Sequence, residues 1–174
     1  MSDLQTPTSK PPFNFERTVC SCAECIKPCH VMPGMLVPED LQPIACKLGG
    51  DTTILLDKLV ASEGAKVGVV REGKLVQFNI PTLVPATKPD GSCVFLENDR
   101  CTIHEVSPFG CRFFDSHVDR QTGNQRMRAG LISVGNAHTE DHNEYSVMWA
   151  WLRSKGRNAT PLAERQAALR ATGF

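Results

Sequence analysis

Eight cysteines constrain what this 174-residue chain can fold into more than any other feature of its sequence. Seven of them fall in two groups, with the spacings C-x-C-x2-C-x3-C and C-x7-C-x9-C. The first group is Cys20, Cys22, Cys25 and Cys29, the second is Cys93, Cys101 and Cys111, and Cys46 stands alone. A C-x2-C unit lets two thiolates approach one ion or cluster from a single turn. The spacing therefore predicts a metal site that joins distant segments, with the seven clustered cysteines as candidate ligands.

The size of the chain and its first residues favour metal binding over disulfides. A chain of this length buries about 70% of the surface that its unfolded form exposes, so its core needs no covalent staples. The first ten residues are polar and lack the apolar stretch of a secretory signal. We therefore expect a cytoplasmic protein, and in a reducing compartment clustered cysteines more often bind metal than form disulfides. No apolar run approaches the roughly 20 residues that span a bilayer, so no membrane segment is expected.

The charge of the chain argues against two classes of partner. Lysine and arginine together number 19, as do aspartate and glutamate, and the formal net charge is zero. Nucleic acid and anionic membranes both demand clustered positive charge, so neither is an expected partner. A protein partner of unknown identity stays open.

The alternative for any cysteine is a buried thiol that acts as a small hydrophobic side chain. Cys46 has the helical spacing of Ile44 and Leu48 and no neighbouring thiol, so a core role is predicted for it. For Cys22, Cys25 and Cys29 metal binding is favoured, because their polar segment would otherwise expose reactive thiols. Cys20 stays open between a ligand, a spare thiol and a thiol with no partner.

The hydrophobic pattern predicts a single α+β domain that spans residues 18–174, after a flexible lead-in over residues 1–17. Its C-terminal helical extension covers about residues 139–174. The predicted elements are a ligand-bearing knuckle at 19–38 that is too broken for a long helix, helices beginning at Pro38 and Asp51, hairpins at 67–80 and 93–104, a loop at 115–125, a short element near 129–134, and helices at 140–155 and 161–171.

The ordered motifs between residues 20 and 114 resemble those of the YkgJ-type cysteine-cluster proteins. They are CAEC with Cys29, PG at 33–34, PEDL at 38–41, GSCVFL at 91–96, CTIH at 101–104 and PFGCRF at 108–113. These bacterial proteins are described as having a zinc- or iron-chelating domain. The resemblance implies that the metal-binding set includes Cys22, Cys25, Cys29, Cys93, Cys101 and Cys111. The chain departs from the family in the spacing of its first group, in His104 where tyrosine is usual, and in Ser107 where arginine commonly precedes the proline.

The metal itself is open between zinc and an iron–sulfur cluster. Soft thiolates suit both, and seven candidate thiolates exceed the four that one zinc ion or one [4Fe–4S] cluster needs. The knuckle has no paired His-x3-His, which favours an all-sulfur site. The family resemblance favours the iron–sulfur cluster.

Three histidines are further candidate ligands. His30 follows Cys29, but a solvated histidine is the favoured interpretation. His138 and His142 lie four residues apart and would share a helix face, yet without a glutamate directly after the first histidine surface positions are favoured. Arg112 is open between a donor to a cluster sulfur and a surface salt bridge.

No catalytic motif accompanies the cysteines, and neither a phosphate-binding loop nor a dinucleotide fingerprint is present. The favoured function is a metal-binding protein that serves electron transfer, metal handling or the support of a partner enzyme. The alternative is an enzyme whose metal is catalytic or structural and whose C-terminal helices, with Trp149 and Trp151, shape a substrate site. A thiol-redox role for Cys20 and Cys22, or for Cys22 and Cys25, lacks the βαβ context that supports it.

Overall fold

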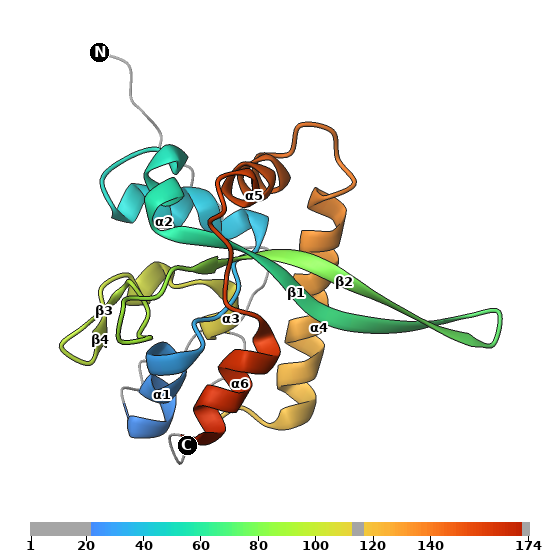
Figure 1. Cartoon of the computed structure of the whole chain (residues 1–174), viewed down its shortest axis with the longest axis horizontal. Coiled ribbons are helices and arrows are strands. Elements are labelled where there is room, and N and C mark those ends of the chain that lie inside the picture. The colour runs from blue at the N-terminus through green and yellow to red at the C-terminus, as the bar shows by residue number, and fades with distance from the viewer. Residues whose placement is uncertain (1–21, 113–116, 172–174) are drawn as a thin grey trace.

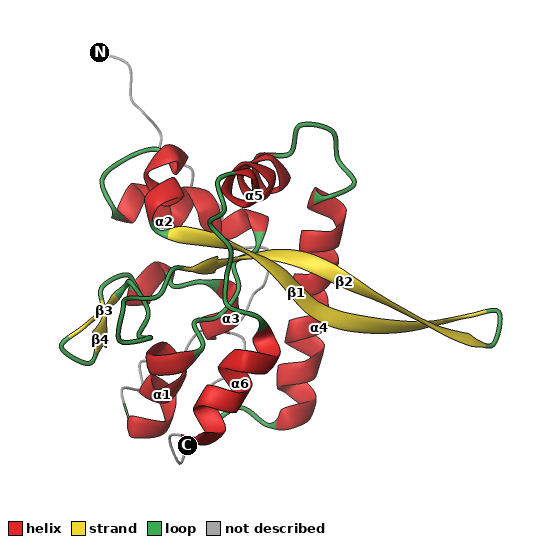
Figure 2. Ribbon diagram, viewed as in Figure 1, coloured by secondary structure: helices red, strands yellow, loops and turns green. Residues whose placement is uncertain are grey.

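The computed structural model describes residues 22–112 and 117–171, so the predicted lead-in and Cys20 lie outside the described residues. Helices and two small antiparallel sheets make up one α+β domain, as predicted (Figure 1; Figure 2). The helices are α1 (Ala23–Val31), α2 (Leu41–Lys47), α3 (Phe109–Arg112), α4 (Arg120–Ala137), α5 (Glu144–Ser154) and α6 (Leu162–Ala171). The strands are β1 (Leu59–Arg71), β2 (Lys74–Pro85), β3 (Leu96–Glu97) and β4 (Arg100–Cys101), and single 3-10 turns cover Pro38–Asp40, Thr52–Asp57 and His104–Val106.

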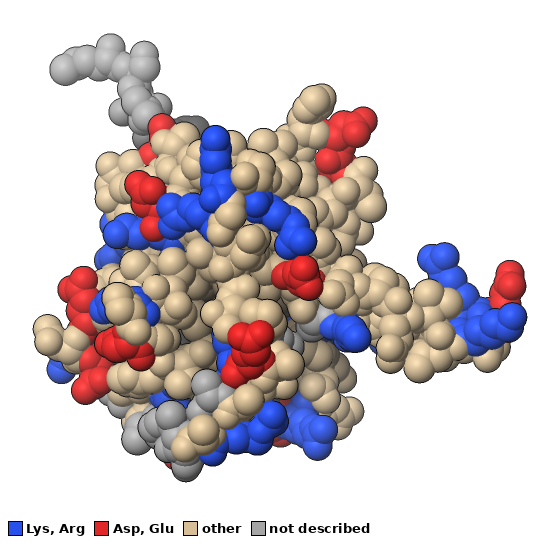
Figure 3. Space-filling view, in the orientation of Figure 1, with Lys and Arg blue, Asp and Glu red and all other residues tan. Residues whose placement is uncertain are grey.

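A long hairpin of β1 and β2 crosses the domain and projects from it (Figure 1). Its turn lies where the sequence placed it, with Glu72 and Gly73 both at positive φ, as a two-residue hairpin turn requires. The far half exposes Val70, Leu75 and Phe78, whereas the last residues of β2 are buried. The hairpin is therefore an arm anchored at its base, and Figure 3 shows basic side chains gathered near its tip.

The hydrophobic core lies between the base of the hairpin and helices α2, α4 and α5. Its largest fully buried side chains include Tyr145, Phe109, Leu36, Ile44, Leu55, Leu59, Leu83, Ile103 and Leu152. The Tyr145 hydroxyl donates to the Leu36 carbonyl oxygen (2.9 Å) and accepts from the Leu83 backbone N–H (2.7 Å). Burial raises the pKa of this hydroxyl, so it stays protonated and holds the two segments together.

Replacement of this tyrosine, Tyr145→Phe, is expected to lower the free energy of unfolding by about 1–3 kcal/mol. The ring keeps its volume, so the loss reports two buried backbone groups that lose their partner rather than a cavity. Urea denaturation monitored by circular dichroism measures the change. A value below about 0.5 kcal/mol would mean that the two backbone groups find other partners.

Helix α4 contradicts the prediction of a loop over residues 115–125 and a short element after it. Its N-cap is Asp119, whose side chain accepts from the Thr122 backbone N–H (2.9 Å). The buried face of α4 includes Gly123 and Gly130 beside Leu131 and Val134. Glycines occupy positions on this face where a helix usually has large apolar side chains. The sequence therefore does not show the apolar spacing that is typical of a helix.

The helix predicted to begin at Asp51 is also wrong beyond its first turns. Asp51 does cap the segment, because its side chain accepts from the Thr53 N–H, but the 3-10 turn ends at Asp57. Strand β1 then begins at Leu59, which pairs with Pro85. The apolar spacing of these residues also suits a helix, but their pairing with β2 makes them a strand.

Two later helices agree more closely with the sequence. The predicted helix at 140–155 is α5, which starts later because Asn143 rather than Thr139 is its N-cap. Gly156 follows it at positive φ, as expected of the residue that ends a helix. The final predicted helix is α6.

None of the helices over residues 22–112 and 117–171 has both the length and the apolarity to cross a bilayer.

Two glycines of α4 give a matched test of its packing. A Cβ at Gly130 would lie 2.3 Å from a ring carbon of the fully buried Phe109, whereas a Cβ at Gly135 meets nothing within 4 Å among the described residues. Gly130→Ala is expected to lower the free energy of unfolding by about 1–3 kcal/mol through overpacking. Gly135→Ala is expected to raise it by about 0.5–1 kcal/mol through helix propensity. Changes of the same sign in thermal or urea denaturation would contradict this packing of α4 on Phe109.

Candidate metal centre

Three cysteines of the first group, Cys22, Cys25 and Cys29, lie at the start of helix α1 or within it, where the sequence predicted a knuckle too broken for a long helix. Cys22 is the N-cap, and the Cys25 and Ile26 backbone N–H groups donate to its carbonyl oxygen at 3.0 and 3.1 Å. Cys22, Cys25 and Cys29 follow one another at intervals of three and four residues, which places them along one face of the helix. A helix of nine residues is long enough to bring these cysteines to one face, so the prolines in and around α1 limit its length but do not prevent the helix from forming.

A histidine completes a compact donor group with the first two cysteines. The Cys22 and Cys25 sulfurs and a ring nitrogen of His117 all lie within 4.8 Å of one another. Cys22 and His117 are exposed, whereas Cys25 is partly buried. His117 stands two residues before Asp119, the N-cap of α4, so the group joins the start of α1 to the start of α4. These three donors lie close enough to bind one metal ion.

Sequence reasoning missed His117. It lies in the polar stretch after Cys111 and has no ligand spacing to any cysteine, and the all-sulfur expectation gave no reason to weigh it. Its one signal was its position six residues after the last cysteine of the second group. The structure places this histidine just before α4, a helix whose start the sequence did not predict.

Cys29 of the first sequence group lies near two cysteines of the second, Cys93 and Cys101. The Cys93 backbone N–H donates to the Cys29 carbonyl oxygen (2.7 Å), and Cys101 lies on β4 opposite Leu96, whose N–H donates to the Cys93 carbonyl oxygen (2.9 Å). The hairpin of β3 and β4 is shorter than predicted, and Asn98 and Asp99 form its turn. A backbone hydrogen bond therefore holds Cys29, at the end of the first sequence group, beside Cys93, at the start of the second.

The thiol of Cys93 is the most buried of this second set. Burial, with a smaller contribution from the neighbouring thiols of Cys29 and Cys101, raises its pKa to about 12. At neutral pH Cys93 is therefore a protonated thiol when no metal is bound, and it packs as part of the hydrophobic core.

Cys111 lies at a close crossing of two backbone segments. The Gly34 N–H donates to the Cys111 sulfur (3.3 Å), and the Gly110 N–H donates to the Met35 carbonyl oxygen (2.7 Å). A Cβ at Gly34 would lie 2.2 Å from the Gly110 backbone carbonyl carbon. The glycines of the PG and PFGC motifs therefore allow two segments to touch, and their contact brings Cys111 near the end of α1.

Arg112 forms an ion pair with Asp40 in the interior of the domain, so its salt bridge is not the surface one that the sequence allowed. The Asp40 carboxylate also accepts from the Phe109 N–H (2.7 Å) and the Val37 N–H (3.0 Å). Burial raises the pKa of Asp40 to about 6, although the Arg112 guanidinium and the two N–H groups act in the opposite direction. This pair ties the PEDL motif to the PFGCR motif.

Cys46 is exposed on α2, where its sulfur accepts from the Gln42 side-chain amide (3.2 Å), so the predicted core role is wrong. Leu41, Ile44 and Ala45 cover the buried face of this short helix and leave Cys46 on the other side.

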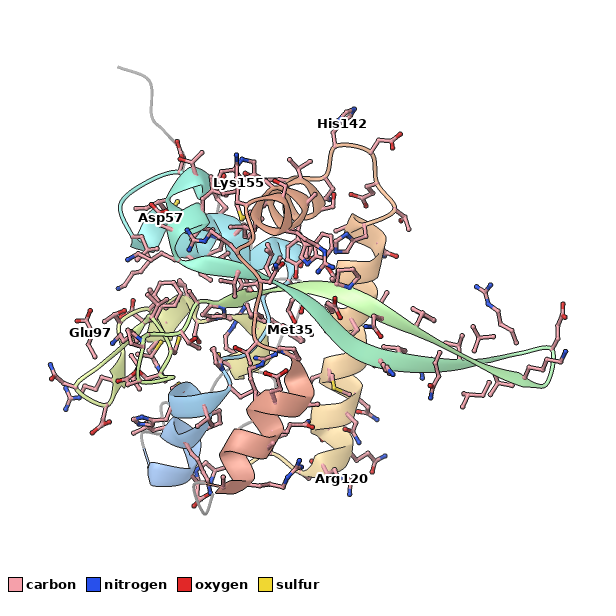
Figure 4. All side chains as sticks on the ribbon, in the orientation of Figure 1. Met35, Asp57, Glu97, Arg120, His142 and Lys155 are labelled. Carbon is pink, nitrogen blue, oxygen red and sulfur yellow. The ribbon has the colours of Figure 1, made fainter. Side chains whose placement is uncertain are left out.

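The remaining histidines and Trp151 have other surroundings. His30 lies 3.3 Å from the Asp99 carboxylate at the molecular surface. His138 is the C-cap of α4 and its Nε2 lies 3.0 Å from the Pro81 carbonyl oxygen, whereas His142 is in the loop after α4, so the helix face predicted for this pair is wrong (Figure 4). Trp151 is exposed on α5.

Comparisons with known proteins identify no relative. No protein-family model, no curated protein and no solved structure matches the chain.

Proposed function

We propose that the protein binds one zinc ion through Cys22, Cys25 and His117, and that this ion stabilises the fold by joining α1 to the segment that leads into α4. The observation that carries the proposal is the mutual distance of these donors, two sulfurs and one ring nitrogen within 4.8 Å of one another. Mixed cysteine and histidine sets are typical of zinc, which accepts both donor types in a tetrahedral site.

The separation of the donors supports a single ion over a cluster. Zinc holds cysteine sulfur at about 2.3 Å and histidine nitrogen at about 2.0–2.1 Å, so two tetrahedral donors lie about 3.5–3.8 Å apart. A small inward movement of the three side chains reaches that geometry. A [4Fe–4S] cluster instead bonds its cysteine ligands to different iron atoms, which keeps their sulfurs farther apart. The iron–sulfur cluster that the family resemblance implies is therefore the second candidate.

Helix α1 supports a structural role for the ion. It has nine residues, fewer than the about 12–15 that an isolated helix needs in water, and Pro28 lies inside it. A bound ion supplies tertiary stabilisation that its own backbone bonds do not. A four-coordinate structural site needs one further donor, and Cys20, two residues before Cys22, is the candidate that the sequence predicted.

We also propose that the chain is a YkgJ-type protein. Two motifs of the resemblance meet at the Gly34–Gly110 crossing, and three more contribute to the group of Cys29, Cys93 and Cys101. Under this proposal Cys93, Cys101 and Cys111 lie on the same thiol-rich side of the domain as the zinc site.

Metal analysis of variants tests the proposed ligands. Purified wild-type protein is expected to contain zinc in a one-to-one ratio, whereas Cys25→Ser and His117→Ala are expected to lose most of it, because an incomplete set of donors binds zinc weakly. Cys46→Ser and His142→Ala are matched controls, since both residues are exposed and lie outside the donor group. Full zinc content in His117→Ala would contradict the proposal. Iron with acid-labile sulfide in the wild type would favour the cluster instead.

A further inference from the structure

An apolar cavity of about 550 Å³ lies between α1, the base of the hairpin, α4 and α6. The apolar side chains that line it include Pro28, Met32, Met35, Val84, Met127 and Leu131. Met35, labelled in Figure 4, lies near the middle of the molecule where these elements meet. The volume is in the range of about 300–1,000 Å³ that is typical of small-molecule sites.

The charged residues that line this cavity are both arginines. Arg120 is exposed at the start of α4, and Arg165 is partly buried on α6. Among the described lining residues none is acidic, so this part of the lining carries two positive charges and no carboxylate. An arginine side chain stays protonated in proteins, so this charge does not disappear with pH.

Arg165 has donor capacity that the described part of the chain does not use. Its Nε is buried and has no hydrogen-bond partner there. Burial also lowers the pKa of Arg165, which shows that the surroundings disfavour its charge. A buried donor without an acceptor costs free energy, and an anion in the cavity would remove that cost.

We propose that this cavity binds an amphipathic organic anion, a carboxylate with an apolar body of the size of a medium-chain fatty acid. The carboxylate pairs with the Arg165 guanidinium, whose planar fork matches two carboxylate oxygens. The apolar body lies among Met32, Met35 and Met127. Methionine is unbranched and flexible, so these side chains adjust to a hydrocarbon chain.

Decanoate is the probe that tests this inference, with the neutral decanol as its comparison. Both are titrated below their aggregation thresholds into the full, metal-loaded chain with ¹³C-labelled methionine methyl groups, observed by NMR. Decanoate is expected to shift the methyl resonances of Met32, Met35 and Met127. The resonance of Met148, which is buried in the core and does not line the cavity, is the internal control and is expected to stay in place.

Variants separate the charge from the cavity. Arg165→Gln is expected to weaken decanoate binding about 10- to 100-fold, the usual value of a charge-assisted hydrogen bond, and to leave decanol binding unchanged. Arg170→Gln on the same helix is the matched control, because Arg170 is exposed and lies outside the cavity. Met127→Trp, at a half-exposed position on the rim, is expected to block both ligands by filling the space.

Three results would overturn the inference. They are decanoate that shifts none of the three methyl groups, Arg165→Gln that binds decanoate as tightly as the wild type does, and decanol that binds as tightly as decanoate. Zinc content is measured on the same samples. A metal-loaded protein that fails to bind decanoate therefore refutes the cavity proposal and leaves the zinc proposal standing.

Discussion

Removal of zinc with a chelator is expected to melt helix α1 while the base of the long hairpin stays folded. The helix is short and contains Pro28, and the side chains by which it packs partly against the core are Ile26 and Cys29. An ion present at a thousand times its dissociation constant stabilises the state that binds it by about 4 kcal/mol. The amides of α1 are therefore expected to lose about a thousandfold of their hydrogen-exchange protection without zinc.

Native-state hydrogen exchange measures this effect residue by residue. The control is the base of the hairpin, where Ala61 pairs with Leu83 and both side chains are buried. Those amides are expected to keep their protection in the chelator. Equal protection of α1 with and without zinc would mean that the ion, if bound, does not stabilise this helix.

The second large effect is expected at the buried ion pair. Asp40→Ala removes the acceptor of the Arg112 guanidinium and of the Val37 and Phe109 N–H groups. It is expected to lower the free energy of unfolding by about 3–5 kcal/mol, because an arginine with little exposed surface then has no counter-charge. Chemical denaturation measures the loss. Glu63→Ala, which removes an exposed partner of Arg153, is the matched control and is expected to cost less than about 1 kcal/mol.

The same carboxyl group gives the stability of the domain a defined pH dependence. Burial raises the pKa of Asp40 from 3.8 to about 6, so the folded state binds this proton more tightly than the unfolded chain does. The contribution of Asp40 to stability is therefore full below about pH 4 and is lost as the pH rises through about 6.

Comparison with Asp40→Asn isolates this contribution. The free energy of unfolding of the wild type minus that of Asp40→Asn is expected to fall by about 3 kcal/mol between pH 4 and pH 7. Both proteins are measured at saturating zinc, so that the pH dependence of metal binding cancels in the difference. A difference that is flat or rises with pH would contradict the raised pKa.

Local patterns in the sequence were enough to predict much of the fold. The turn of the long hairpin and the two last helices follow from residues adjacent in the chain, such as Gly73, Gly156 and Pro161. The spacing of the first cysteine group predicted candidate ligands, and two of them, Cys22 and Cys25, do lie close enough to bind one metal ion together with His117. That spacing suits a helix face as well as a knuckle, so the local structure of these cysteines was not predicted.

The parts that escaped prediction depend on contacts between distant segments. Gly130 contributes to a buried helix face because Phe109 fills the space above it, and no local period reveals that. His117 lies close to Cys22 and Cys25 because it stands just before α4, two residues ahead of the N-cap Asp119. The proximity of Cys29 to Cys93 depends likewise on a backbone hydrogen bond between residues far apart in the chain, which their spacing in the sequence does not reveal.

X-ray absorption at the zinc edge of the protein as isolated tests the central claim most directly. The ion proposed at Cys22, Cys25 and His117 is expected to show sulfur at about 2.3 Å together with nitrogen at about 2.0–2.1 Å, and the outer-shell scattering of an imidazole ring. His117→Ala is expected to remove the imidazole signal, and His142→Ala is expected to keep it. A first shell of sulfur alone, or a sample that holds iron in place of zinc, would contradict a site built from these three residues.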